Sequence, residues 1–235
     1  MKKFQKKILR KTGKAINLYN LISEGDKIIV GLSGGKDSWT LLKILLILQA
    51  KAPVNFYLKA VKIAYPHTEE QNNKIKEYCL KSGIEFYVLD RGVSRVMQEK
   101  SEPELSHCAL CSRLRRGILY SEAVKTGFNK IALGHHREDF NTTLLLNLFF
   151  QSSIKPMKPI MKADDYPAKV IRPLALTPEN LIAEYASRED FPVLTAGCSY
   201  SEKTERERIS RLLDSLEKTY PQIKQNIISA QQKLF

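Results

Sequence analysis

The sequence predicts an α/β protein with a Rossmann-like, mostly parallel sheet flanked by helices, and with helical extensions at its N- and C-termini. Three observations predict this class. Residues 27–32 form a short run rich in β-branched side chains, as in buried parallel strands. Further strand-like runs alternate with helical stretches, which is typical of βαβ units. A glycine-containing loop joins the first of these strands to the helix that follows it.

The first 150 residues contain most of the expected elements. Residues 2–21 have apolar side chains at helical spacing among many lysines and predict an amphipathic helix, whose basic face either contacts RNA or is only solvated. Apolar runs predict strands at 27–32, 56–63, 85–89 and 130–133. Helical patterns occupy residues 39–48, 69–81, 112–125 and 139–150.

Prolines break the chain into short pieces after residue 151: Pro156, Pro159, Pro167, Pro173 and Pro178. A strand is expected at 169–172 and a helix at 179–187, and helical patterns return at 202–216 and 222–234. We therefore expect a basic N-terminal helix at 1–24, the main α/β domain at 25–200 and a C-terminal helical extension at 201–235.

The chain of 235 residues is long enough for one substantial core, and it carries a formal net charge of +13. Such an excess recruits polyanions, and nucleic acid is the first candidate. A generally basic, solvated surface is the alternative. No apolar run approaches the roughly 20 residues that span a bilayer, so no membrane partner is expected.

The basic start of the chain lacks the apolar region of a secretion signal, so we expect a cytoplasmic protein. Four cysteines occur, at Cys79, Cys108, Cys111 and Cys198. Structural disulfides are rare in a reducing compartment, so metal binding or redox chemistry is the better expectation for these thiols.

The segment Ser33-Gly34-Gly35-Lys36-Asp37-Ser38 lies between a predicted buried strand and a predicted helix. Free backbone N–H groups and the helix dipole make such a junction an anion site. The glycines let the backbone approach a phosphate closely, the two serines add hydroxyl donors, and Asp37 can approach Mg²⁺. The segment is not a Walker loop, because an aspartate follows Lys36. A tight turn without a ligand is the structural alternative.

Cys108 and Cys111 form a Cys-x-x-Cys pair, and Cys198 supplies a third thiol far along the chain. The spacing alone fits half of a zinc site, a redox pair or two buried cysteines. Three arginines follow the pair within the next helix, at Arg113, Arg115 and Arg116. Their guanidinium groups can meet phosphate or a developing negative charge.

The loop matches Ser-Gly-Gly-x-Asp-Ser, the signature of the PP-loop, or N-type, ATP pyrophosphatase superfamily, at every fixed position. The chain therefore resembles this superfamily, with its adenine nucleotide α hydrolase-like fold. The resemblance implies that residues 25–200 form a PP-loop domain, which cleaves ATP between the α and β phosphates and holds the departing pyrophosphate.

Within the superfamily, the chain looks closest to tRNA 2-thiolation enzymes of the 2-thiocytidine synthetase type. Several motifs carry this likeness, in order: Cys108-x-x-Cys111 with Arg115 and Arg116, then Gly134-His135-His136-Arg137-Glu138-Asp139, Thr143-Leu144, Asn147-Leu148-Phe149-Phe150, Arg172-Pro173-Leu174, Glu184-Tyr185-Ala186 and Cys198. The family often has Asp-Asp where this chain has Glu138-Asp139, so only Asp139 is carried over. It also often has a further cysteine just after Cys198, which this chain lacks.

The resemblance implies that Cys108, Cys111 and Cys198 bind a 4Fe-4S cluster and leave one iron open, with Zn²⁺ as the alternative metal. Cys79 lies in an apolar helical pattern and is expected in the core. The resemblance further implies that Gly134 and His136 bind the nucleotide and that Asp139 and Arg115 are catalytic, with Arg116 as the alternative arginine. His135 is either functional or a cap of the next helix.

The expected reaction has two steps. ATP activates the C2 oxygen of a pyrimidine in tRNA, and sulfur carried by the cluster then replaces AMP. The implied partners are tRNA and a sulfur donor, either sulfide or a persulfide made by a cysteine desulfurase; the assembly state is left open, with a homodimer as one alternative. The rivals are a PP-loop ligase of the 2-thiouridine or lysidine type and a non-catalytic, metal-containing RNA-binding protein.

Overall fold

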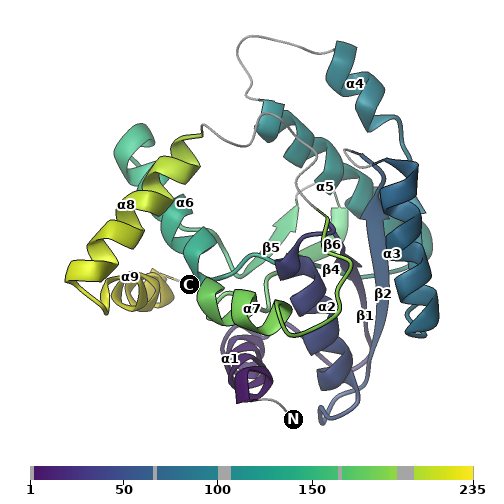
Figure 1. The fold of residues 1–235 in the computed structure, drawn as a ribbon, viewed down its shortest axis with the longest axis horizontal. Coiled ribbons are helices and arrows are strands. Elements are labelled where there is room, and N and C mark those ends of the chain that lie inside the picture. The colour runs from purple at the N-terminus through teal and green to yellow at the C-terminus, as the bar shows by residue number, and fades with distance from the viewer. Residues whose placement is uncertain (1–2, 66–67, 100–106, 164–165, 195–203, 235) are drawn as a thin grey trace.

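The computed structural model describes residues 3–234 except 66–67, 100–106, 164–165 and 195–203. Its described strands form one six-stranded sheet in the order β3-β2-β1-β4-β6-β5 (Figure 1). The strands are β1 (Asp26–Gly31), β2 (Phe56–Ile63), β3 (Phe86–Leu89), β4 (Lys130–Ala132), β5 (Ile160–Ala163) and β6 (Tyr166–Ile171). The sheet is mostly parallel, which confirms the predicted fold class.

The sheet places the ends of distant segments at one edge. Strand β1 is central and pairs in parallel with β2 and β4, and β4 pairs in parallel with β6. The carboxyl ends of these four strands therefore meet at the same edge, where open α/β sheets bind their ligands. Strand β5 is the exception, because it runs antiparallel to β6 with Ile160 opposite Ile171.

Helices cover both faces of the sheet. Helices α1 (Lys3–Leu18), α2 (Lys36–Gln49), α3 (Glu69–Lys81) and α7 (Glu179–Ala186) share one core with β1 and β2. Helices α4 (Val93–Glu99) and α5 (His107–Thr126) pack on the opposite face against β1, β2, β4 and β6. Both faces of β1 are buried, as its continuous apolar sequence predicts.

A third group of helices lies beside the sheet, on the left in Figure 1. It consists of α6 (Arg137–Gln151), α8 (Glu205–Thr219) and α9 (Ile223–Gln231), which a short 3₁₀ turn (Gln232–Leu234) follows. Phe140 of α6 and Ile228 of α9 are buried in the same small cluster, which also takes in Ala15 of α1. Both helical extensions thus pack on the rest of the chain. The domain division at residues 24 and 200 stays a prediction.

Three features differ from the sequence analysis. The structure adds the short helix α4 and the strand β5, which the pattern did not predict. Helix α5 begins at His107, five residues before the expected start, so Cys108 and Cys111 belong to its first turns and not to a loop. Within the described ranges, no helix is both long enough and apolar enough to cross a bilayer.

Candidate active site

The loop between β1 and α2 is built as an anion site. Gly34 has φ +93°, a left-handed conformation that favours glycine. Side-chain hydroxyls hold the loop, since Ser33 N donates to Ser38 Oγ (3.2 Å) and Gly35 N donates to Ser33 Oγ (3.3 Å). Gly35 is the N-cap of α2 and has no side chain to accept from the first turn. The backbone N–H groups of that turn are therefore available to a phosphate.

Charged side chains flank this helix start. Lys36 Nζ lies 2.9 Å from Glu179 Oε1 of α7 and 3.1 Å from Asp37 Oδ1. Burial opposes the lysine charge, but these two carboxylates outweigh it and raise the pKa of Lys36. Asp37 Oδ1 is buried and accepts no well-formed hydrogen bond from any described residue, despite the nearby ammonium. A buried carboxylate oxygen left in this way beside a phosphate site fits Mg²⁺.

The segment after β4 packs directly against the first turn of α2. A Cβ at Gly134 would lie 3.1 Å from Asp37 C and 3.1 Å from Ser38 N, so a larger residue would push this turn away by a few tenths of an ångström. The next residues, His135 and His136, are thereby brought to the loop. Close packing is thus a structural reason for a glycine at position 134, in addition to the nucleotide-binding role that the resemblance implies.

His136 lies between carboxylates at the start of α2 and at the start of α6. Its Nε2 is 3.9 Å from Asp37 Oδ1 and 3.6 Å from Asp139 Oδ2, and its Nδ1 is 3.2 Å from Glu138 Oε2. Burial disfavours a charged ring, but the Glu138 hydrogen bond and the three carboxylates outweigh burial and raise the pKa of His136. His136 is also the N-cap of α6, so the alternative that His135 caps this helix was wrong.

Glu138 is the centre of this cluster, although the sequence analysis did not select it. Its Oε1 accepts from Arg137 Nη2 (2.6 Å), and its Oε2 accepts from the backbone N–H of Glu179 at the start of α7 (2.8 Å). Burial would raise its pKa, but the hydrogen bond with His136 and the charge of Arg137 outweigh burial and hold the pKa of Glu138 at about 2. Glu138 therefore fixes α6 and α7 against each other beneath the loop.

Asp139 joins the C-terminal helices to the site. Its Oδ2 accepts from the backbone N–H of His136 (2.9 Å), and its Oδ1 accepts from Arg206 Nη2 of α8 (2.8 Å). Burial would raise the pKa of Asp139, but the two histidines and Arg206 outweigh burial and lower it. Asp139 is thus ionised. Its Oδ2 faces His136, and the His136 ring lies between Asp139 and Asp37.

Cations lie on the other side of the loop. Lys62 of β2 is fully buried, and its Nζ is 3.4 Å from Ser33 O. Burial, and then the charge of Arg115, lower the pKa of Lys62 to about 7. Arg115 of α5, the predicted catalytic arginine, is therefore close to the base of the phosphate loop. Sequence analysis did not select Lys62, which stands within an apolar strand pattern.

A second cationic pair surrounds His135. Arg172 follows β6, and its Nε donates to His135 Nδ1 (3.2 Å), which leaves the ring proton on Nε2. Burial, and then the charge of Arg172, lower the pKa of His135 to about 4, so this ring is neutral at pH 7. Burial and the charge of Arg116 in turn lower the pKa of Arg172 to about 10. The charge of Arg115 thus affects Lys62, and the charge of Arg116 affects Arg172, at the same edge of the sheet.

The structure describes one of the three predicted cluster cysteines. Cys111 lies half-buried in α5, one helical turn before Arg115. The side chain of Cys108 and the whole of Cys198 lie outside the described residues, and no group of three metal-binding side chains occurs among the residues that are described. The shared metal site therefore stays a prediction. Cys79 is fully buried, and burial raises its pKa to about 12, which confirms its place in the core.

The segment before Cys198 leads toward the loop. Leu194 N donates to Gly34 O (3.0 Å), and its side chain lies 3.1 Å from the position of a Cβ at Gly34. Phe191 stacks on Trp39 of α2 with ring centroids 5.8 Å apart. These contacts hold residues 191–194 against the phosphate loop and the helix that follows it.

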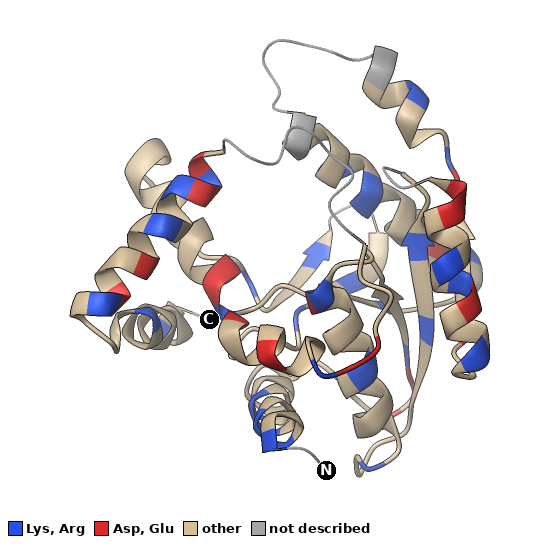
Figure 2. Cartoon of the chain, viewed as in Figure 1, with Lys and Arg blue, Asp and Glu red and all other residues tan. Residues whose placement is uncertain are grey.

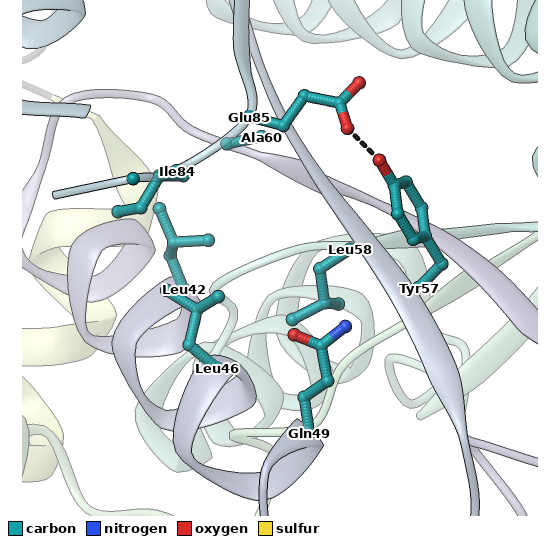
Figure 3. A pocket seen from close by; sticks show the side chains of 9 residues that line it. Leu42, Leu46, Gln49, Tyr57, Leu58, Ala60, Ile84 and Glu85 are labelled. Carbon is teal, nitrogen blue, oxygen red and sulfur yellow. Dashed lines mark hydrogen bonds between the residues drawn. The ribbon is translucent and has the colours of Figure 1, made fainter. Parts of the chain in front are cut away.

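A pocket of about 200 Å³ lies far from these groups (Figure 3). It lies between α2, β2 and the turn before β3, and Leu42, Leu58 and Ile84 make much of its apolar lining. Tyr57 and Glu85, which are hydrogen-bonded to each other, lie at its rim. Because Tyr57 is near the amino end of β2, the pocket belongs to the opposite edge of the sheet from the loop. It offers no chemistry comparable with the cluster around Asp37.

Comparison with known proteins agrees with this arrangement. The model of the PP-loop domain family matches residues 2–216. A tRNA-cytidine(32) 2-sulfurtransferase of Alcanivorax borkumensis is 42% identical over 235 residues, which cover 100% of this chain and 83% of the relative. The protein of that name from Chromohalobacter salexigens is 43% identical over 220 residues, covering 93% and 78%.

A solved structure shares the fold along nearly the whole chain. The U34-tRNA thiolase NcsA from Methanococcus maripaludis, determined with its 4Fe-4S cluster, superposes with a TM-score of 0.81 at 23% identity and covers 98% of this chain and 78% of that one. The predicted adenine nucleotide α hydrolase-like fold is thereby confirmed. With the family match over most of the sequence and relatives at 42% and 43% identity, this chain belongs to the PP-loop domain family, among the tRNA-cytidine(32) 2-sulfurtransferases.

Proposed function

We propose that this enzyme uses ATP to replace the C2 oxygen of a cytidine in tRNA by sulfur, at position 32 as the names of its relatives indicate. One observation carries the proposal. The phosphate loop at the start of α2, the carboxylates around His136 and the arginines of α5 converge on one edge of the sheet. A nucleotide bound there would have its reacting phosphate beside both acids and cations.

In the first step, the N–H groups at the start of α2 bind the β and γ phosphates. Asp37 would hold Mg²⁺ through its buried Oδ1, and Lys36 and Lys62 add positive charge. The C2 oxygen of the base attacks the α phosphorus, an O–P bond forms, and pyrophosphate leaves with the electrons of the broken bond. His136 and Asp139 are near enough to orient the nucleotide or the base.

In the second step, a sulfur at the oxidation level of sulfide attacks C2. The C2–S bond forms, the C2–O bond breaks, and AMP leaves with the oxygen, so no oxidant is needed. Arg115 would stabilise the negative charge that develops during this exchange. Cys108, Cys111 and Cys198 would hold a 4Fe-4S cluster, whose open iron position supplies a binding site for sulfur.

The chain geometry supports this ligand set. Cys111 is one helical turn before Arg115, and Cys198 follows Leu194 by four positions, a length of chain that reaches at most about 14 Å. Since Leu194 is hydrogen-bonded to Gly34, a thiol within that distance can reach the same edge. Zn²⁺ stays the alternative metal. The sulfur donor, the homodimer and the cytoplasmic location stay predictions.

The test is reconstitution of the reaction with purified protein. Anaerobically prepared enzyme is incubated with a tRNA transcript, ATP, Mg²⁺ and sulfide, and the digested RNA is analysed by nucleoside mass spectrometry. The expected product is 2-thiocytidine, with pyrophosphate released in equal amount, and a transcript with uridine at position 32 should give neither.

The other outcomes identify the rivals. A 2-thiouridine product would show that the modified base is uridine and not cytidine. Pyrophosphate release without a thiolated base would favour a ligase in which an amine attacks the adenylate. Binding of tRNA with no pyrophosphate release would leave a non-catalytic RNA-binding protein. Iron and acid-labile sulfide, measured on the same preparation, separate a cluster from zinc.

A further inference from the structure

The C-terminal end of α6 is an exposed apolar surface that the site does not use. It consists of Leu148, Phe149, Phe150 and Ile154, with exposed fractions of 43%, 53%, 58% and 70%. We call it the apolar end of α6. A contiguous exposed apolar patch of this kind is typical of a surface that binds another molecule. In Figure 1 this end of α6 extends past the start of α8.

The loop after α6 is held in place and leads back to the candidate active site. Asn147 Nδ2 donates to Lys155 O (2.5 Å), and Ser153 N donates to Asn147 O (3.1 Å). Farther along, Arg172 Nη1 donates to Lys158 O (2.5 Å), and Arg172 is the residue that binds His135. These hydrogen bonds connect the segment after α6, through Arg172, to His135 at the edge of the sheet where the loop of residues 33–38 lies.

The charges along this surface fit a polyanion. No aspartate or glutamate occurs between residues 140 and 163, while Lys155, Lys158 and Lys162 do, and all three are exposed. The helix α8 beside it adds no net positive charge, because its arginines pair with Asp139, Glu205 and Glu207 and red bands accompany the blue ones in Figure 2. The positive charge here therefore comes from the lysines after α6. A second copy of this chain, which has a net charge of +13, would bring like charges together at this position.

We propose that the apolar end of α6 is the surface on which unpaired bases of the RNA substrate stack, beside the nucleotide that reacts. Phe149 and Phe150 would provide the ring faces, and the three lysines would contact the phosphates. Specific RNA recognition commonly uses unpaired bases stacked on aromatic rings. The inference rests on the proposed function, because it takes RNA as the substrate.

The distance along α6 agrees with this role. Asp139 lies at the start of the helix and Phe150 near its end, so their backbones are about 16 Å apart at 1.5 Å per residue. Bases two or three nucleotides from the reacting one can span that distance within one single-stranded loop. The helix would thus hold the reacting base at one end and its neighbours at the other.

The test measures RNA binding by fluorescence anisotropy with two probes, a stem-loop RNA with an unpaired loop and a fully paired RNA duplex. Replacing both rings, in the variant Phe149→Leu/Phe150→Leu, keeps an apolar surface and removes the stacking faces. We expect affinity for the stem-loop to fall at least about tenfold and affinity for the duplex to stay unchanged. Phe149→Tyr/Phe150→Tyr should bind the stem-loop like the wild type.

The matched control is Leu80→Ala, which removes another exposed apolar side chain, 78% exposed, on α3. It should change neither affinity, and all variants should melt and bind ATP like the wild type. Equal stem-loop affinity in wild type and the leucine variant would overturn the inference alone. A dimer in the wild type that the variant loses, seen by light scattering with unchanged RNA binding, would overturn it in favour of a protein interface. A wild type that binds neither RNA would overturn the proposed function as well.

Discussion

Replacing Glu138 by glutamine should destabilise the protein strongly, although the shape of the side chain is kept. One carboxylate oxygen of Glu138 accepts from Arg137 and the other from the backbone of Glu179. An amide has only one acceptor oxygen, so its NH₂ group must face either the guanidinium or the N–H group. Either arrangement leaves a buried donor without its partner, and Arg137 loses its closest counter-charge.

The size of the effect follows from the environment of the carboxylate. Burial opposes its charge, but the hydrogen bond from His136 and the Arg137 interactions hold the pKa of Glu138 at about 2 instead of 4.5. That difference corresponds to about 3 kcal/mol in favour of the folded, ionised state. For a chain of this length, such a loss lowers the melting temperature by about 6–12 °C.

Urea unfolding of wild type and Glu138→Gln at several pH values measures this loss. Because the folded-state pKa is lowered, the stabilisation is complete above the unfolded value of 4.5 and disappears as the pH falls toward 2. The difference in the free energy of unfolding between the two proteins should therefore be constant near neutral pH and should vanish in acid. Glu70→Gln is the control, since its exposed ion pair with Lys74 is worth little. A Glu138→Gln variant within about 0.5 kcal/mol of the wild type at neutral pH would refute the reasoning.

Four shorter predictions concern the site and its partners. Asp37→Ala should abolish pyrophosphate release and leave the melting temperature near that of the wild type, because the buried Oδ1 serves a metal and not the packing; normal turnover would remove Asp37 from the site. Cys111→Ala should lose bound iron while ATP binding survives, whereas Cys79→Ala should keep iron and cost about 1 kcal/mol in urea unfolding as a packing change. Gly134→Ala should weaken ATP binding about tenfold in titration calorimetry, because its Cβ would press on the first turn of α2 at 3.1 Å; unchanged affinity would show that the turn gives way at no cost. Binding of tRNA should weaken steeply with salt, and a flat response would make the net charge of +13 incidental.

Elements whose signals are local could be predicted from the sequence. Helix α3 occupies the residues that its helical pattern predicts, and the structure adds a capping box of Thr68 and Gln71 at its start. Strand β2 has the predicted bounds, since its apolar run continues to the strand end. The antiparallel strand β5 was missed because prolines surround it and because it pairs with β6, a contact that no local pattern reports.

The side chains of the site divide in the same way. The phosphate loop could be predicted because its signature is contiguous and lies between a strand and a helix. Glu138 could not be, because its role depends on Glu179, which comes 41 positions later and meets it only through the fold. Lys62 was missed for a similar reason, since its buried side chain meets Ser33, 29 positions away, only through the fold. A lysine next to an apolar strand end gives no sign of the loop carbonyl that it faces.

The charges of the site are separated in a way that suits transfer of an adenylyl group. Carboxylates gather around His136, on the segments that begin α2, α6 and α7, while Lys62, Arg115 and Arg172 come from β2, α5 and the end of β6. A phosphate chain at the start of α2 would lie between these two groups, where a metal ion on Asp37 and the cations of β2 and α5 would both offset its charge. Because separate elements supply the two halves, substitutions on one side should change metal dependence and those on the other should change the affinity for nucleotide or RNA. A double substitution across the two should therefore show coupling only when the nucleotide is bound, since the nucleotide is what joins them.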